Sequence, residues 1–222
     1  MKQKIQLAIF DLAGTTVKHK REVHNSFIAA FQKENITIDY QTANEAMGKP
    51  KPVAIEEILY SMDRSGKELK DRIHENFLFE MVNYYRNTDE LEEQDGASHI
   101  FEYLQSNGIQ VAIDTGFDRE TADVLLMKLG FDKIIDHSVT SDEVEHGRPY
   151  PDMIYKLQDL ANVDNPVVVM KIGDTPVDLL EGHEAGVGLN IGITCGAFTS
   201  EELQKYPHTH LIRTLDEIKN LL

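Results

Sequence analysis

Side chains that could handle a phosphoryl group follow several apolar stretches of this chain. Asp11 ends the run LAIFD, Thr115 follows VAID, and Asp174 follows VVVMKIG. Arg148 lies in HGRPYPDM, just before a helical pattern. Phosphoryl transfer needs an attacking oxygen, groups that neutralise three equatorial oxygens, and Mg²⁺ between the phosphate and carboxylates. These four residues supply groups of those kinds.

The elements that must position them alternate between strand and helix. Short runs rich in β-branched residues predict strands at Gln6–Phe10, Gln110–Ile113, Ile134–Val139, Val167–Ile172 and Gly188–Ile193. Helical patterns lie between most of them, at Arg119–Leu129, Asp152–Asn162, Asp178–Ala185 and Glu201–Lys205. Fully apolar runs such as PVVVMKI are typical of parallel strands covered on both faces. The chain is therefore expected to form a doubly wound α/β fold with a parallel sheet.

One interval interrupts this alternation with helical periodicity alone. Apolar residues recur at Val23, Phe27, Ala30 and Phe31, and again at Leu69, Ile73, Phe77, Met81 and Tyr84. We therefore expect a small all-helical cap domain at residues 17–86, inserted after the first strand of an α/β core formed by residues 1–16 and 87–222. The stripe around Phe27 could serve a small internal core or a subunit interface, so both a monomer and a homodimer are compatible with it.

The ends of the strands are expected to bring the polar residues together. In open α/β sheets, ligands bind outside the carboxyl ends of the strands, near the point where the strand order reverses. Asp11 and Asp174 at such ends would offer the hard oxygen ligands that Mg²⁺ prefers. Thr115 and Gly116, at a helix start, would suit a phosphate through hydrogen bonds and the helix dipole.

The same residues also have purely structural interpretations. An aspartate before small residues, such as Asp11, is often a turn residue or a helix cap. GDTPVD could be a capped helix start, with Asp174 or Thr175 as the cap, Pro176 in the first turn and Asp178 in the favourable dipole. The segments that contain Asp11, Thr115, Arg148 and Asp174 occur in this order, each after an apolar strand. This combination favours the catalytic interpretation over the structural one.

These segments carry a family resemblance. The order FDLAGTT, DTG, GRPYP and GDTPVD resembles the haloacid dehalogenase superfamily of phosphotransferases over essentially the whole chain. The resemblance implies that Asp11 is a nucleophile that becomes phosphorylated, with Thr115 and Arg148 assisting. It also implies that Mg²⁺ is held by Asp11, the backbone carbonyl of Ala13 and Asp174. Further residues near the phosphate or behind these groups are then Thr15, Gly116 and Asp178.

Three departures from the usual superfamily pattern resemble the phosphonoacetaldehyde hydrolases and their relatives. Ala13 replaces the usual second aspartate, Arg148 replaces the usual lysine, and the stretch EAMGKPK carries Lys51 where that group has a Schiff-base lysine. The aspartate normally donates a proton to a leaving oxygen. When a P–C bond is cleaved, an iminium on the lysine accepts the electrons instead, so no acid at position 13 is required.

Other features of the sequence favour a phosphonatase-like relative over phosphonoacetaldehyde hydrolase itself. Ala54 stands where a histidine would be expected in that enzyme, and the carboxyl-terminal region is shorter. Lys51 then has two interpretations. It forms a Schiff base, or it only attracts a small phosphoryl or phosphonate substrate.

The composition of the chain argues against several classes of binding partner. The 222 residues include 38 acids and 22 bases, a net charge of −16, which argues against a nucleic-acid partner because phosphates favour a basic face. No apolar run approaches the roughly 20 residues that span a bilayer, and the amino-terminal apolar run is too short for a signal peptide. The single Cys195 suits a reducing compartment. A cytoplasmic protein that binds no membrane is therefore expected.

Three classes of function are consistent with Asp11 at a strand end. The favoured one is a Mg²⁺-dependent hydrolase. A signalling receiver also phosphorylates an aspartate, but receivers are shorter and have no helical insert after the first strand. A binding module that kept the pocket and lost turnover is supported only by Ala13.

Overall fold

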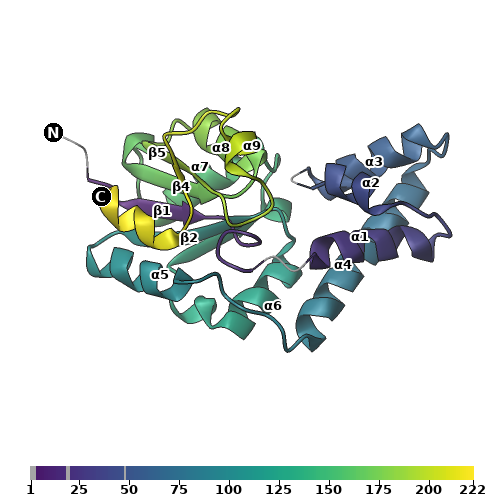
Figure 1. The fold of residues 1–222 in the computed structure, drawn as a ribbon, viewed down its shortest axis with the longest axis horizontal. Coiled ribbons are helices and arrows are strands. Elements are labelled where there is room, and N and C mark those ends of the chain that lie inside the picture. The colour runs from purple at the N-terminus through teal and green to yellow at the C-terminus, as the bar shows by residue number, and fades with distance from the viewer. Residues whose placement is uncertain (1–3, 19–20, 48) are drawn as a thin grey trace. The chain divides into compact units, whose positions relative to one another are not determined.

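The structure is a computed structural model that describes residues 4–18, 21–47 and 49–222. It divides into two compact units, Met1–His19 with Leu91–Leu222, and Lys20–Glu90. The first contains a sheet and helices, and the second is helical (Figure 1). The sequence placed the two divisions after residues 16 and 86. Residues 1–3 at the amino-terminal start, residues 19–20 of the expected cap and Gly48 of EAMGKPK lie outside the described residues.

Six strands form one parallel sheet in the order β3-β2-β1-β4-β5-β6. The strands are β1 (Leu7–Phe10), β2 (Gln110–Thr115), β3 (His137–Thr140), β4 (Val169–Gly173), β5 (Leu189–Ile193) and β6 (His210–Ile212). The strand order reverses at β1, which pairs with both β2 and β4. This topology confirms the expected doubly wound α/β fold and places the switch point at the end of β1.

Helices cover the sheet of this unit. They are α5 (Ala97–Ser106), α6 (Arg119–Leu129), α7 (Asp152–Ala161), α8 (Pro176–Glu184) and α9 (Ser200–Leu203), with short 3-10 segments at Phe131–Lys133, Ser141–Glu143, Pro166–Val168 and Leu215–Asn220. Alternate residues of β1 pack on opposite sides of the sheet. Leu7 and Ile9 join a core with Met153 of α7, whereas the ring of Phe10 meets that of Phe101 of α5 edge-on at 5.1 Å. Both faces of β1 are therefore buried, as its apolar sequence requires.

The helical unit contains α1 (Glu22–Lys33), α2 (Tyr40–Glu45), α3 (Lys51–Ser61) and α4 (Lys67–Asn87). Its core is aromatic, because the ring of Phe27 meets those of Phe31 and Phe77 edge-on at 5.2 and 5.8 Å. Tyr85, not Tyr84, is the buried residue at the end of the α4 stripe, and its hydroxyl bonds the Glu22 carboxylate at 3.2 Å. The expected helical periodicity is present, with this shift of one residue.

Some strand boundaries differ from those expected. Strand β4 begins later than its apolar run, because a 3-10 segment occupies Pro166–Val168. Strand β3 also begins later, at His137 instead of Ile134. Strand β6 was not predicted, because three residues between polar neighbours carry little periodicity. These differences do not affect the carboxyl ends of the strands that carry the predicted site residues.

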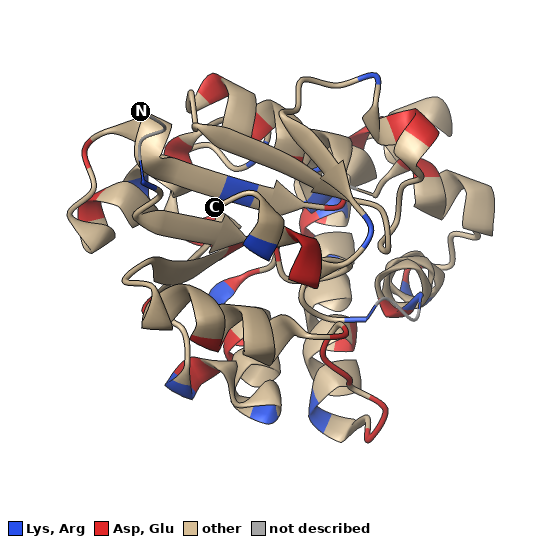
Figure 2. Ribbon diagram, turned by 60° about the vertical axis from the view of Figure 1, so that its left-hand side comes forward, with Lys and Arg blue, Asp and Glu red and all other residues tan. Residues whose placement is uncertain are grey.

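Charged residues lie mainly on helices and loops, and the strands are almost free of them (Figure 2). Of the helices in the described residues, none has both the length and the apolar character needed to cross a membrane. The few charges at the carboxyl ends of the strands therefore stand out from their apolar surroundings.

Candidate active site

Asp11 follows β1, and the residues after it fold back in a tight turn. The backbone N–H of Thr16 donates to the carbonyl of Leu12 at 3.0 Å. Gly14 has φ of +94°, and a Cβ there would lie 2.3 Å from Oδ2 of Asp174. Small residues follow Asp11 because this turn lies directly against the carboxylate that ends β4.

Thr115 ends β2 and is buried, and the helix expected after it at Arg119–Leu129 has these same bounds in the structure. Helix α6 begins at Arg119, and the Asp118 carboxylate caps its first turn. The N–H of Arg119 donates to the Asp142 carboxylate at 3.1 Å. The expectation that Thr115 and Gly116 lie at the helix terminus is wrong, because aspartates already satisfy that terminus. Any phosphate contact from Thr115 and Gly116 must come from the loop itself.

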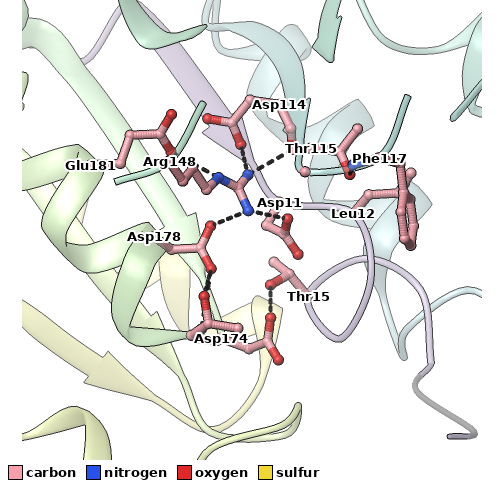
Figure 3. Close-up of polar contacts among 12 residues, drawn as sticks. Asp11, Leu12, Thr15, Asp114, Thr115, Phe117, Arg148, Asp174, Asp178 and Glu181 are labelled. Atoms are coloured by element: carbon pink, nitrogen blue, oxygen red, sulfur yellow. Dashed lines mark hydrogen bonds and ion pairs between the residues drawn. The ribbon is translucent and has the colours of Figure 1, made fainter. Parts of the chain in front are cut away.

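Arg148 lies in the loop before α7 and gathers carboxylates from several elements (Figure 3). Its Nη1 lies 2.6 Å from Oδ1 of Asp11 and 2.8 Å from Oδ1 of Asp178. Its Nε donates to Oε2 of Glu181 at 3.0 Å, and its Nη2 donates to the carbonyl of Asp114 at 2.9 Å and to the carboxylate of the same residue. The structure thus brings together Asp11, Arg148 and Asp178, as the sequence predicted.

The segment GDTPVD has a structural role and also contacts the site. Thr175 caps α8, and Oδ2 of Asp178 accepts hydrogen bonds from its N–H at 3.2 Å and its hydroxyl at 2.5 Å. Pro176 is the first helical residue. Because the other oxygen of Asp178 contacts Arg148, the capping interpretation does not exclude the functional one.

Asp174 is completely buried and is held by neutral donors. Its Oδ1 accepts a hydrogen bond from the Thr15 hydroxyl at 3.1 Å, and its Oδ2 accepts one from the Ala197 N–H at 2.7 Å. A Cβ on Gly196 would lie 2.1 Å from Oδ2. Thr15 therefore orients Asp174 in this structure, and the loop after β5 completes the enclosure of that carboxylate.

Sequence reasoning missed three fully buried charged residues, Asp114, Lys171 and Glu181. The ammonium of Lys171 contacts Oδ1 of Asp114 and lies 3.2 Å from both Oδ1 of Asp178 and Oε2 of Glu181. The available signal was the lysine within the apolar run VVVMKI, since a charge inside a buried strand requires opposite charges around it.

Burial controls the protonation of these acids. It raises the pKa of Asp11 to about 6, although the Arg148 guanidinium opposes the shift. Burial, together with the charges of Asp11 and Asp178, raises the pKa of Asp174 to about 8. The pKa of Asp114 is instead lowered, because Arg148 and Lys171 outweigh the effect of burial. A bound cation would therefore stabilise the ionised form of Asp174.

Buried carboxylates that could hold a metal lie in two places of the site. Asp11, Asp114 and Asp178 offer oxygens within 4.8 Å of one another, but Arg148 contacts all three carboxylates and repels a further cation. Asp174 has no such neutralising partner in the part of the chain that the structure describes. Asp174 therefore offers a divalent cation a buried carboxylate beside the turn that follows Asp11.

Lys51 lies in the helical unit, at the first residue of α3. Its Nζ donates to the carbonyl of Ala46 at 3.0 Å and lies 5.6 Å from the centre of the Phe27 ring. Burial lowers the pKa of Lys51 to about 8. Lys49 differs, because it pairs with Glu57 at 2.6 Å on an exposed surface. The two lysines of GKPK thus have separate environments.

Comparisons with known proteins agree with the geometry. A family model described as haloacid dehalogenase-like hydrolase matches residues 8–190. A phosphonoacetaldehyde hydrolase from Bacteroides fragilis is 30% identical over 233 residues, covering 98% of this chain and 88% of that protein. Another from Bacillus mycoides is 31% identical over 242 residues, with the same two coverages.

Solved structures share the fold. A phosphonoacetaldehyde hydrolase-like protein from Oleispira antarctica superposes with a TM-score of 0.87 at 21% identity, over 99% of this chain and 92% of that one. A hydrolase from Pseudomonas syringae gives 0.84 at 22% identity, over 97% of each chain. At these identities the superpositions establish the architecture alone.

Proposed function

This chain belongs to the haloacid dehalogenase-like hydrolases, and we propose that it is a Mg²⁺-dependent, phosphonatase-like member of that family. It would hydrolyse a small phosphorylated or phosphonate metabolite through a phosphoaspartyl intermediate on Asp11. The observation that supports this most is the Asp11 carboxylate at the switch point of the sheet, with Arg148 on one oxygen and the Asp174 carboxylate close by. The curated relatives support a phosphonate or phosphate substrate.

The residues around Asp11 would have different roles in phosphoryl transfer. The Asp11 carboxylate would attack phosphorus, forming the acyl phosphate as the bond to the leaving group breaks. Arg148 and the loop of Thr115 and Gly116 would neutralise charge on the phosphoryl oxygens. Mg²⁺, when held by Asp11, the Ala13 carbonyl and Asp174, supplies the largest local positive charge. Such a positive charge is needed to bind an anionic substrate, because the net charge of the chain is −16.

The remaining assignments form part of the same proposal. Residues 17–86 would act as a cap that governs specificity, and residues 1–16 with 87–222 as the phosphotransferase core. The protein would work in the cytoplasm as a monomer or a homodimer, on a small anion, without a nucleic-acid or membrane partner. The acidic composition supports the exclusion of nucleic acid.

A second candidate function is cleavage of the P–C bond of phosphonoacetaldehyde, with Lys51 as a Schiff base. The observation in its favour is the partly buried Lys51 amine, whose pKa falls to about 8, so that a large fraction is neutral and nucleophilic near that pH. The amine would condense with the aldehyde and release water. As Asp11 takes the phosphoryl group, the electrons of the P–C bond would pass to the iminium and form an enamine. This candidate requires Lys51 to reach a substrate held by Asp11.

Phosphate release tests the proposal and the alternative of a binding module without turnover. The purified chain with Mg²⁺ is incubated with phosphonoacetaldehyde, other small phosphonates and small phosphate esters, beside the Asp11→Asn variant as the matched control. We expect release from at least one substrate by the parent chain and none by the variant, because an amide cannot form the acyl phosphate. Binding of a panel member without release would support the binding module.

A further inference from the structure

Lys171 is a completely buried lysine in β4, a strand otherwise built of apolar residues and glycine. Desolvating an ammonium costs several kcal/mol unless close opposite charges offset it. An apolar side chain at this position would pack in the sheet without that cost. The presence of a lysine therefore calls for an explanation beyond packing.

The ammonium of Lys171 shares its partners with Arg148, atom for atom. Both cations contact Oδ1 of Asp114. Oδ1 of Asp178 lies 2.8 Å from Arg148 and 3.2 Å from Lys171, and Oε2 of Glu181 lies 3.0 and 3.2 Å from them. Three carboxylate oxygens thus bridge two cations.

The fold makes room for this arrangement. A Cβ on Gly182 of α8 would lie 3.2 Å from Cγ of Lys171 and 2.3 Å from Oδ1 of Asn190. A Cβ on Gly173 would lie 2.2 Å from Cγ of Asp178. Glycine at both positions lets α8 lie close to β4, which brings Asp178 and Glu181 to the ammonium.

We propose that Lys171 is a positioning residue of the Asp11 site. By holding the three shared oxygens it fixes the plane of the Arg148 guanidinium, so that Nη1 is presented to Asp11 (Figure 3). Without Lys171, a single cation would face four carboxylates, and the guanidinium could turn toward Asp114 and Glu181 and away from Asp11. The inference rests on the proposed role of Asp11, but the geometry can be tested without turnover.

The kinetic test is a double-mutant cycle between Lys171→Met and Arg148→Lys. Lys205→Met, which removes an exposed lysine of the same unit, is the control for loss of one charge. We expect Lys171→Met to lower kcat by about 10- to 100-fold with Arg148 present, as for partners that orient a ligand. In the Arg148→Lys background its effect should shrink to about twofold or less. If Lys171→Met lowered kcat by the same factor with Arg148 present and in the Arg148→Lys background, Lys171 would not act through Arg148.

A second variant keeps the test valid if Lys171→Met does not fold. Lys171→Met/Glu181→Gln removes one positive and one negative charge, so the net charge of the network is unchanged. We expect it to fold and still to lose at least about tenfold in kcat relative to Glu181→Gln. If kcat stays within about twofold of that of Glu181→Gln, Lys171 serves only to balance the charge of the network, and the proposal is overturned.

A readout without substrate separates this inference from the proposed function. The Nε–Hε resonance of Arg148 in ¹⁵N-labelled protein is identified by its absence in Arg148→Lys. We expect this resonance to shift or broaden in Lys171→Met/Glu181→Gln relative to Glu181→Gln. An unchanged resonance would contradict the positioning role even in an active enzyme. If the parent chain released no phosphate, the proposed hydrolysis would fail while a shifted resonance would still support the role of Lys171.

Discussion

The guanidinium of Arg148 holds one oxygen of the Asp11 carboxylate, with Nη1 2.6 Å from Oδ1. Within the residues that the structure describes, Oδ2 of Asp11 accepts no hydrogen bond. One oxygen of the proposed nucleophile is therefore oriented by a cation and the other is left for phosphorus or a metal. This division of a single buried carboxylate is what the proposed chemistry requires, because attack and charge neutralisation must occur together.

Two replacements of Arg148 should separate the effect of its positive charge from that of its guanidinium geometry. Arg148→Met should lower kcat by about 100- to 1000-fold, the usual loss when one preorganised group is removed. It should also destabilise the fold by about 3–5 kcal/mol, because buried carboxylates lose their cation. Arg148→Lys keeps the charge but not the fork of donors, so its losses should be smaller. Steady-state kinetics and urea unfolding measure both effects, and a fully active Arg148→Met variant would exclude Arg148 from the site.

Metal binding should stabilise the fold through Asp174. Adding Mg²⁺ at about 100 times its Kd should increase the unfolding free energy by about 2.7 kcal/mol, and chelator should abolish activity. Asp174→Asn should lose the increase while its metal-free form stays folded, because it removes a carboxylate whose pKa burial raises to about 8. Asp164→Asn, at an exposed loop position, is the matched control. Thermal unfolding with and without Mg²⁺ makes the comparison, and full activity in excess chelator would contradict the metal site.

The sequence predicted the residues at the strand ends and missed those inside the elements. Asp11, Arg148 and Asp178 were predictable because parallel strands and their following loops meet at one edge of the sheet. The lysine within VVVMKI indicated a buried charge, but its contact with Asp114 was not predictable, because the periodicity of apolar runs indicates burial and not which side chains face each other. The bounds of α6 were predicted correctly, but Thr115 and Gly116 lie in the loop before it, because Asp118 and not Thr115 has the capping geometry.

Lys51 should titrate near pH 8. Burial disfavours its charged form and lowers its pKa from 10.5 to about 8. The folded state therefore binds fewer protons than the unfolded state between these values, so this group makes the unfolding free energy rise with pH from about 8 to 10.5. Acetylation of Lys51, followed by mass spectrometry against pH, should reach half its maximal rate near pH 8. The exposed Lys67 serves as the internal comparison. A midpoint for Lys51 above pH 10 would contradict the lowered pKa.

The role of Lys51 in chemistry is a separate prediction. We expect Lys51→Arg mainly to raise KM, because the guanidinium keeps the charge that attracts the substrate. Borohydride added with phosphonoacetaldehyde should then leave no adduct on the parent chain. Peptide mapping after reduction checks this, with Lys49→Arg as the matched control. A reduced adduct on Lys51, with essentially complete loss of activity in Lys51→Arg, would instead establish the P–C cleavage candidate.

Phosphorylation of Asp11 is the step on which the proposed hydrolysis depends, and it can be observed directly. The chain is mixed with Mg²⁺ and the best substrate of the phosphate-release panel, quenched in acid within one turnover, and its peptides are mapped by mass spectrometry. We predict a mass increase of one phosphoryl group on the peptide that contains Asp11, present during turnover and absent in Asp11→Asn. Rapid phosphate release with an unmodified Asp11 peptide at every quench time, or a phosphoryl group on another residue, would contradict the mechanism.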